Sequence, residues 1–241
     1  MEGSNTNNTS KKICPNNGNG ITGLIGLEEH YPRARDIQDF IRWYFYYLSN
    51  ILKQLDTAVI EQMIQILLKA AQQGSTIYVV GNGGSAATAS HLVNDLAVGA
   101  WLPDYPPFRV ISLADNVPVM TAIANDFDYA CLFVNQLRSL LRPGDIVIAL
   151  SVSGNSPNVL EAVRFARQHG AVTIGCCGFD GGALRELTDI CLHVPTHPGE
   201  YGPAEDVMMI LDHVIHAYFM LSRRGTLQRS QGEMVTVAAW K

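Results

Sequence analysis

The sequence has little charge, few cysteines and no long apolar run. Charged residues make up 16% of the 241 positions, and the five cysteines form no CxxC pair. An odd number of scattered cysteines argues against a disulfide framework or a zinc ribbon and is typical of reduced thiols. No apolar segment approaches the ~20 residues that a membrane-spanning helix needs. We therefore expect a cytoplasmic protein that makes no use of a membrane.

Positive charge is also scarce. Lysine and arginine number 17 against 22 aspartates and glutamates, which gives a net charge of −5, and no basic run stands out. Nucleic acid is therefore excluded as a partner. Hydrophobic residues reach 47%, which is enough for a sizeable core in one α/β domain or at most two small ones.

The composition divides the chain into three parts. Residues 1–28 are rich in Asn, Gly and Ser and lack the apolar stretch of a signal peptide, so we expect a disordered leader. The folded domain is expected over residues 29–222. Residues 223–241 are a C-terminal tail, in which 226–240 are ambiguous between tail and edge strand.

The folded part is predicted to begin with a pair of helices over 36–55 and 56–73, where apolar residues recur at steps of three and four. The first helix is apolar around much of its girth, which favours packing on another subunit. Short β-branched runs then alternate with helical stretches. This rhythm predicts the α/β class, a doubly wound five-stranded parallel sheet. The strands are expected at 76–80, 109–113, 145–150, 172–176 and 190–194, and the helices at 86–98, 117–125, 129–141, 158–169, 183–188 and 203–221.

Two predicted strands end in unusual loops. The first reads GNGGS over 81–85, and the second reads SVSGNS over 151–156. Glycines let the backbone approach an anion, and the helix after each loop directs free N–H groups at it. Hydroxyls on such a turn make a phosphate site that needs no lysine or arginine. Neither loop has the spacing of a nucleotide-binding signature.

The runs GNGGSAATASHLVND, LADNVPVMTAIANDFDY and SVSGNSPNVLEA together resemble the sugar isomerase (SIS) domain family. Within it they are most similar to bacterial phosphoheptose isomerases. The resemblance implies the SIS fold and an enzyme that converts sedoheptulose 7-phosphate to a D-glycero-heptose 7-phosphate through an enediol(ate). It also implies a homotetramer with active sites at subunit interfaces. The serines that it implies as ligands of the sugar phosphate are Ser85, Ser151, Ser153 and Ser156.

Metal-ligating side chains occur on two predicted helices. His91 and Asp95 are four residues apart, on one helix face, and Glu205 and His213 are eight apart. The matching positions of phosphoheptose isomerases usually hold His, Glu, Gln and His, which bind zinc. The resemblance thus implies one Zn²⁺ per active site, although two imidazoles and two carboxylates also suit Mn or Co. Neighbouring or weaker candidates are Asp206, Asp212, His216, His193 and His197.

Aldose–ketose isomerisation needs a base for the carbon-bound proton and an acid at the carbonyl oxygen. By resemblance, the catalytic pair is Asp95 and His213. The remaining substrate-binding candidates lie in the two loops, after the second strand or in the family-like ANDFDY stretch. Asn82 has an alternative role in turn geometry through a left-handed conformation. These candidates are Asn82, Gly83, Asp115, Asp126, Val152 and Asn155.

A different class of function is a non-catalytic SIS tetramer that binds a phosphosugar or a protein, similar to the replication-initiator-associating protein of bacteria. The four metal-capable residues favour the enzyme, because a binding protein does not need them. A sugar-phosphate-sensing regulator is disfavoured, since no DNA-binding helix-turn-helix segment or basic arm is visible.

Overall fold

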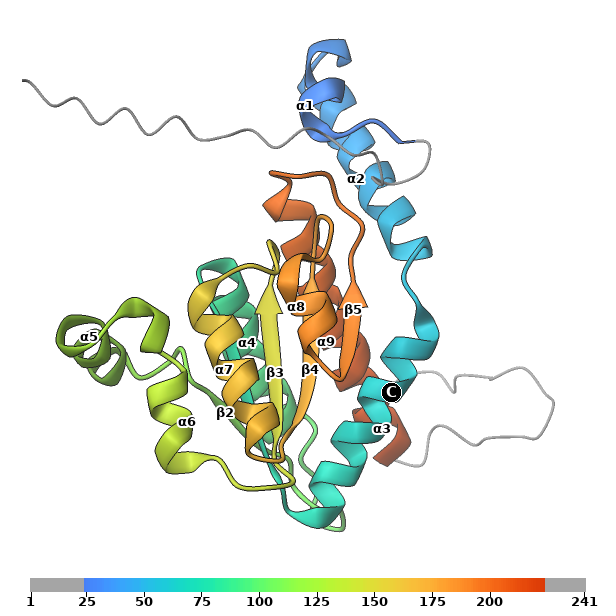
Figure 1. Ribbon diagram of the computed structural model, residues 1–241. Coiled ribbons are helices and arrows are strands. Elements are labelled where there is room, and N and C mark those ends of the chain that lie inside the picture. Colours follow the sequence, from blue (N-terminus) through green and yellow to red (C-terminus); the bar gives the residue numbers. More distant parts are fainter. Residues whose placement is uncertain (1–23, 224–241) are drawn as a thin grey trace, which may run out of the picture.

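The computed structural model describes residues 24–223, so the predictions for residues 1–23 and 224–241 lie outside the described residues. The chain forms a parallel sheet in which the strands follow the order β2-β1-β3-β4-β5 (Figure 1). This confirms the predicted α/β fold with five parallel strands. The strand bounds are β1 (Thr76–Gly81), β2 (Arg109–Ser112), β3 (Ile146–Ser151), β4 (Val172–Cys177) and β5 (Ile190–His193).

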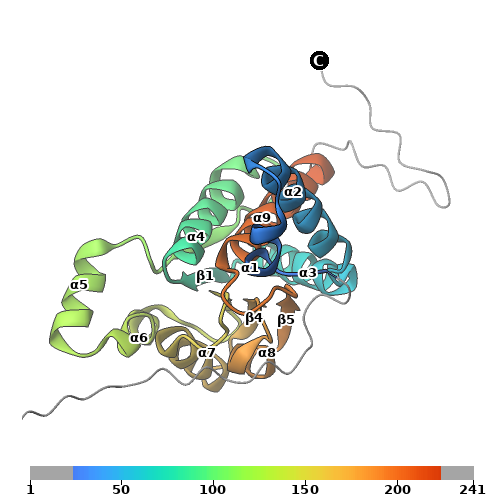
Figure 2. The same cartoon turned by 90° about the horizontal axis from the view of Figure 1, so that it is seen from above.

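Helices cover both faces of the sheet, as Figure 2 shows from above. One face carries α3 (Thr57–Gln73), α4 (Gly84–Asn94) and α9 (Tyr201–Arg223), and α2 (Ile37–Lys53) packs on α9. The opposite face of the sheet carries α6 (Val134–Leu140), α7 (Pro157–Gln168) and α8 (Gly182–Leu187). No helix in the described part is long and apolar enough to cross a bilayer. The other helices are α1 (Leu27–His30), α5 (Val117–Asp126) and two 3₁₀ turns, Tyr31–Arg33 and Tyr129–Cys131.

The strands read as continuous apolar runs because both of their faces are buried. In β1, Ile77 and Val79 contribute to the core under α3, α4 and α9, whereas Tyr78 and Val80 contribute to the core under α6 and α7. The pattern is typical of a parallel sheet between two helical layers. It leaves the ends of the strands as the place for polar side chains.

The strand order reverses between β1 and β3. In an open parallel sheet this switch point is where two neighbouring strands send their following loops to opposite faces, and ligands bind in the crevice beyond it. The GNGGS loop follows β1 and the SVSGNS loop follows β3, whose residues pair directly with those of β1. The topology therefore brings the two predicted anion-binding loops together.

One helix ends differently from the prediction. The sequence predicts a single helix over 86–98, but the α-helix begins at Gly84 and gives way to a π-helical segment over Asp95–Gly99. Segments of this kind occur often at functional sites, because one wider turn re-aims the side chains that follow.

Candidate active site

A cavity of about 150 Å³ lies at the switch point of the sheet. Its serines come from both loops, so the structure brings together the four serines that the resemblance implied as phosphate ligands. Ser151 and Ser156 also hydrogen-bond each other, with 3.2 Å between their hydroxyl oxygens. The lining residues are Asn82, Ser85, Leu150, Ser151, Val152, Ser153, Ser156, Tyr201 and Glu205.

Two helix N-termini face this serine cavity. The residues that precede α4 and α7 are Gly83 and Ser156, and neither caps its helix with a side-chain hydrogen bond. The first N–H groups of α4 therefore have no side-chain acceptor at the cap and can bind an anion. α7 offers fewer, because Pro157 has no N–H and the Val159 N–H donates to the Asn158 side chain. Gly83 has a φ of 56°, so a glycine makes the left-handed turn that opens α4.

Asn155 holds the serine loop in place. Its side-chain oxygen accepts the N–H of Ala183 at 2.9 Å, its backbone N–H donates to the Ser153 hydroxyl at 3.3 Å, and its own side chain is exposed. The loop is thereby tied to the start of α8. Asn155 contacts the loop that carries the serines, whereas the cavity itself is lined by its neighbours.

Asn82 forms a reciprocal pair with Asn158. Each side-chain amide donates to the other's oxygen, at 2.9 and 2.8 Å, and the Tyr129 hydroxyl donates to the Asn82 oxygen at 3.0 Å. Among the described non-glycine residues only Phe179 has a positive φ, so the left-handed role considered for Asn82 is wrong, and the positive φ of this turn belongs to Gly83. Asn82 is instead a side chain held rigidly at the edge of the cavity.

Three of the four predicted metal ligands lie together. One ligand atom each from His91, Asp95 and His213 fall within 4.8 Å of one another, across the contact between α4 and α9. Two imidazole nitrogens and one carboxylate form the donor set of a catalytic divalent metal, with a position left open for water or substrate. The residues present therefore fit such an ion.

Two further side chains of α9 contact these ligands. Asp212 Oδ2 lies 2.8 Å from His91 Nδ1, and His216 Nδ1 lies 3.1 Å from Asp95 Oδ2. Burial raises the pKa of Asp212 above its ordinary value, and the bond to His91 opposes that rise. Asp212 and His216 thus contact the two candidate ligands contributed by α4 and its π-helical extension.

Glu205, the fourth predicted ligand, is not part of this group. It lines the serine cavity, and its carboxylate packs so closely on Gly84 that a Cβ there would overlap it. Eight residues of helix span about 12 Å, which separates Glu205 from His213. Burial, with Asp206 nearby, raises the pKa of Glu205. Both residues thus lie on α9, with Glu205 at the serine cavity and His213 in the group with His91 and Asp95.

The two weaker histidine candidates have partners elsewhere. His193 Nε2 lies 2.8 Å from the carbonyl oxygen of Phe179, and His197 Nε2 lies 3.2 Å from that of Leu24. Both rings therefore make structural contacts away from His91.

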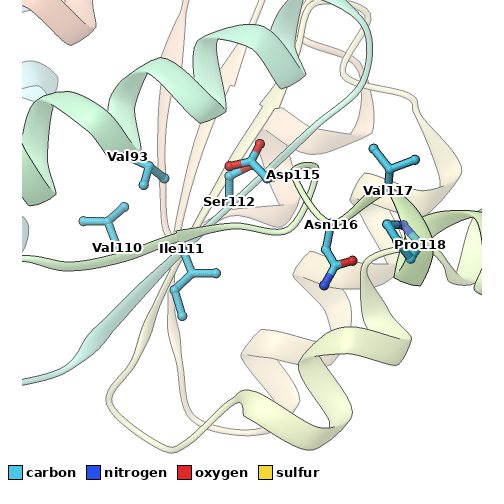
Figure 3. A pocket seen from close by; sticks show the side chains of 8 residues that line it. All are labelled: Val93, Val110, Ile111, Ser112, Asp115, Asn116, Val117 and Pro118. Atoms are coloured by element: carbon cyan, nitrogen blue, oxygen red, sulfur yellow. The ribbon is translucent and has the colours of Figure 1, made fainter.

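A second, open hollow of about 640 Å³ lies along the edge strand β2 (Figure 3). Asp115 lines it and accepts hydrogen bonds from the hydroxyls of Ser90 and Ser112. Asp126 is exposed at the end of α5 and accepts from the Asn125 amide. Neither aspartate lines the serine cavity. The hollow is otherwise mostly apolar, with Val93, Val110, Ile111, Asn116, Val117 and Pro118 around it.

Sequence reasoning missed three residues at the serine cavity. Tyr201 begins α9, lines the cavity and contacts Phe179 edge-to-face with ring centroids 5.0 Å apart. Its position four residues before Glu205 is the signal that could have found it, because i and i+4 share a helix face. Asn158 and Tyr129, which hold Asn82, depend on tertiary packing and carry no local signal.

Comparison with known proteins agrees with this fold and site. The SIS domain family matches residues 43–178, and the chain belongs to that family. The phosphoheptose isomerase of Trichlorobacter lovleyi is 38% identical over 58% of this chain and 71% of its own length, and that of Pelobacter propionicus is 41% identical over 54% and 68%. The structure of the phosphoheptose isomerase of Neisseria gonorrhoeae superposes with a TM-score of 0.69 at 27% identity, over 76% of this chain and 98% of that one. Within the SIS domain family, the chain is a member of the phosphoheptose isomerases, a group of aldose–ketose isomerases.

Proposed function

We propose that this chain is a divalent-metal-dependent enzyme that converts sedoheptulose 7-phosphate to D-glycero-heptose 7-phosphate. One observation carries the proposal: the serine cavity and the group His91, Asp95 and His213 lie along the same two helices, α4 and α9. From Ser85 to His91 the rise along α4 is about 9 Å. An open-chain sugar with its phosphate among the serines extends its carbonyl end toward the metal ligands.

The four serine hydroxyls and the N–H groups at the starts of α4 and α7 bind the phosphate in this proposal. Within the described residues no lysine or arginine lines the cavity. The phosphate charge is therefore balanced by helix dipoles and hydrogen bonds. Asn82, held by Asn158 and Tyr129, faces the sugar hydroxyls from the cavity edge.

Asp95 and His213 are the proposed acid–base pair. In the ketose-to-aldose direction the base removes a proton from C1 and an enediol(ate) forms. A proton passes from the C1 hydroxyl to the C2 oxygen, and the carbon-bound proton returns to C2. A bound Zn²⁺, or Mn²⁺ or Co²⁺ in its place, would polarise the carbonyl oxygen. His91, Asp95 and His213 would hold it, and because Asp95 and His213 are also the acid–base pair, their coordination would exchange with substrate during turnover. Glu205, predicted as a fourth ligand, faces the substrate side of α9.

We further propose a cytoplasmic homotetramer with active sites at subunit interfaces. Asp115 and Asp126 lie outside the serine cavity of their own chain: Asp115 follows the edge strand β2, and Asp126 ends α5, a helix that stands apart from the sheet (Figures 1 and 2). A second copy packed against this region would bring them to a shared site. The free, partly buried thiols of the described cysteines suit a reducing compartment.

The test couples metal content to turnover. The purified full chain is analysed for bound metal by plasma mass spectrometry, and sedoheptulose 7-phosphate is followed by NMR before and after chelation. Stoichiometric metal with chelator-sensitive formation of an aldose phosphate is expected. Metal without turnover would redirect the assay to other phosphosugars. Neither metal nor turnover, even after metal is restored, would overturn the proposal in favour of a non-catalytic SIS tetramer.

A further inference from the structure

Asp212 is a buried carboxylate dedicated to one partner. Its residue is 3% exposed, its Oδ2 lies 2.8 Å from His91 Nδ1, and its Oδ1 is buried without a hydrogen-bond partner. Among the described residues, no side chain other than His91 hydrogen-bonds it. Burying a carboxylate is unfavourable unless an interaction compensates for the lost hydration. The fold therefore keeps a buried carboxyl group, which is unfavourable, in contact with a single histidine side chain.

That contact determines which nitrogen of His91 is free. An ionised Asp212 only accepts, so a neutral His91 in this contact carries its proton on Nδ1 and keeps the lone pair on Nε2. A histidine that binds a metal commonly donates its other ring N–H to a carboxylate, which fixes both tautomer and ring orientation. Asp212 makes this contact one residue before His213, on the helix that faces His91.

His216 makes a similar contact with the other ligand of this segment. Its Nδ1 lies 3.1 Å from Asp95 Oδ2, and its ring lies against Gly99, where a Cβ would come within 2.7 Å of Nε2. Asp95 and Gly99 are the first and last residues of the π-helical segment. The wider turn and the missing side chain at Gly99 together leave room for the imidazole beside Asp95.

We propose that Asp212 and His216 are positioning residues that orient His91 and Asp95 for a divalent ion. The inference rests on the metal site of the proposed function and deepens it. Neither residue binds the ion itself: Asp212 orients His91 through a hydrogen bond, and His216 orients Asp95 through an ion-pair contact, both between α9 and the α4 segment.

The first test is zinc affinity, measured by competition with a chromophoric chelator on the full chain. Asp212→Asn keeps the shape and removes the charge, and it should weaken zinc binding 10- to 100-fold, the effect usual for such supporting residues. Asp206→Asn is the matched control, because it removes a carboxylate from the same helix that contacts Tyr44 and not His91. An Asp212→Asn affinity within twofold of wild type, while His91→Gln loses tight binding, overturns the role of Asp212.

His216 is tested by a conservative pair. Asn in its place keeps a donor near the Nδ1 position, whereas Leu removes it. His216→Leu should weaken zinc binding about tenfold and His216→Asn should restore most of the loss. Equal losses in both variants, with unchanged melting temperature of the metal-free protein, would show that the donor to Asp95 is irrelevant.

A metal-independent measurement separates failure of this inference from failure of the metal site. Nitrogen NMR of ¹⁵N-histidine-labelled protein reports the tautomer of His91, which is expected to be Nδ1–H in wild type and to lose that preference in Asp212→Asn. If wild type and His91→Gln bind zinc equally weakly, the metal site is wrong, and the tautomer alone decides the role of Asp212. An Nε2–H tautomer in the metal-free wild type overturns it.

Discussion

Ser151 ends β3 and Ser156 directly precedes α7. The Ser151 hydroxyl donates a hydrogen bond to the Ser156 hydroxyl inside the serine cavity. If they bind phosphate in the ground state and the transition state alike, removing one hydroxyl weakens both equally. Ser156→Ala should raise the KM for sedoheptulose 7-phosphate about tenfold, the effect of one lost hydrogen bond to a charged group, with kcat within twofold. Steady-state kinetics measure this, with the exposed Ser139→Ala on α6 as control. A fall in kcat at unchanged KM would contradict phosphate binding by Ser156.

Glu205 brings a carboxyl group into the same cavity, and burial raises its pKa. The Glu205 carboxyl group therefore stays neutral to higher pH than an ordinary glutamate. Above its pKa, its negative charge repels a bound phosphate. The KM should therefore rise as pH increases through this pKa. Glu205→Gln should remove that step and lower the KM at pH 7.5 by about threefold to tenfold, as expected for two screened charges in contact.

Kinetics of the variant between pH 5 and 8 test the role of Glu205. Asp180→Asn, which removes a carboxylate from the exposed turn before α8, is the control. If Glu205→Gln loses bound metal instead, Glu205 acts as the fourth ligand that the resemblance implied.

Asp95 and His213 are the residues on which the chemistry is expected to depend. Asp95→Asn and His213→Ala should each lower kcat by 10²- to 10⁴-fold, the usual contribution of a positioned acid or base. His169→Ala, which removes a ring stacked on Phe165 at the surface, is the control. Full isomerase activity in either Asp95→Asn or His213→Ala would rule out the proposed pair.

At the scale of elements, the backbone of the serine loop packs closely on the turn that opens α8. Gly154 has a φ of 63°, and a Cβ on it would overlap the carbonyl oxygen of Gly181. Gly74, after α3, has a φ of 70° and nothing near its Cβ position. Alanine at either position is destabilised by the positive φ. In Gly154→Ala the new Cβ also clashes with the Gly181 carbonyl oxygen, whereas in Gly74→Ala it meets no other atom.

We expect Gly154→Ala to lower the free energy of unfolding by about 1–3 kcal/mol more than Gly74→Ala does. Thermal unfolding checks this as a difference of several degrees between the two variants. The KM of Gly154→Ala should also rise, because the loop shifts with it. Equal melting temperatures of the two variants would show that the serine loop can move away from α8 without loss of stability.

The elements were predictable where burial alone determines the pattern. The strands β1 and β3 read as continuous apolar runs because helices cover both faces, and their polar ends marked the switch point. The predicted single helix over 129–141 is divided into the 3₁₀ turn Tyr129–Cys131 and α6. The sequence also gives no sign of the π-helical segment at Asp95–Gly99, because its apolar residues continue the α-helical period of the residues before it.

At the scale of the whole molecule, the site depends on the packing of α4 against α9. The resemblance identified His91, Asp95 and His213, and the structure brings them together. It could not show that Glu205 lines the serine cavity against Gly84, outside the group of His91, Asp95 and His213. Asp212 and His216 were visible only as neighbours of a ligand. Their contacts with His91 and Asp95 arise between segments more than 100 residues apart, which no local period encodes.

Exposed apolar side chains on α2 predict that the protein forms an oligomer. Ile37, Ile41 and Phe45 recur every four residues along α2 and are 79%, 44% and 66% exposed. An exposed apolar stripe of this kind favours packing against another subunit, and we expect a tetramer. Light scattering of the wild type should give a mass four times that of one chain, and Phe45→Glu should give smaller species. If active sites lie at the interfaces, the dissociated variant also loses isomerase activity, while Gln65→Glu on the exposed side of α3 keeps both. A wild-type monomer with full activity would contradict the tetramer and the shared site together.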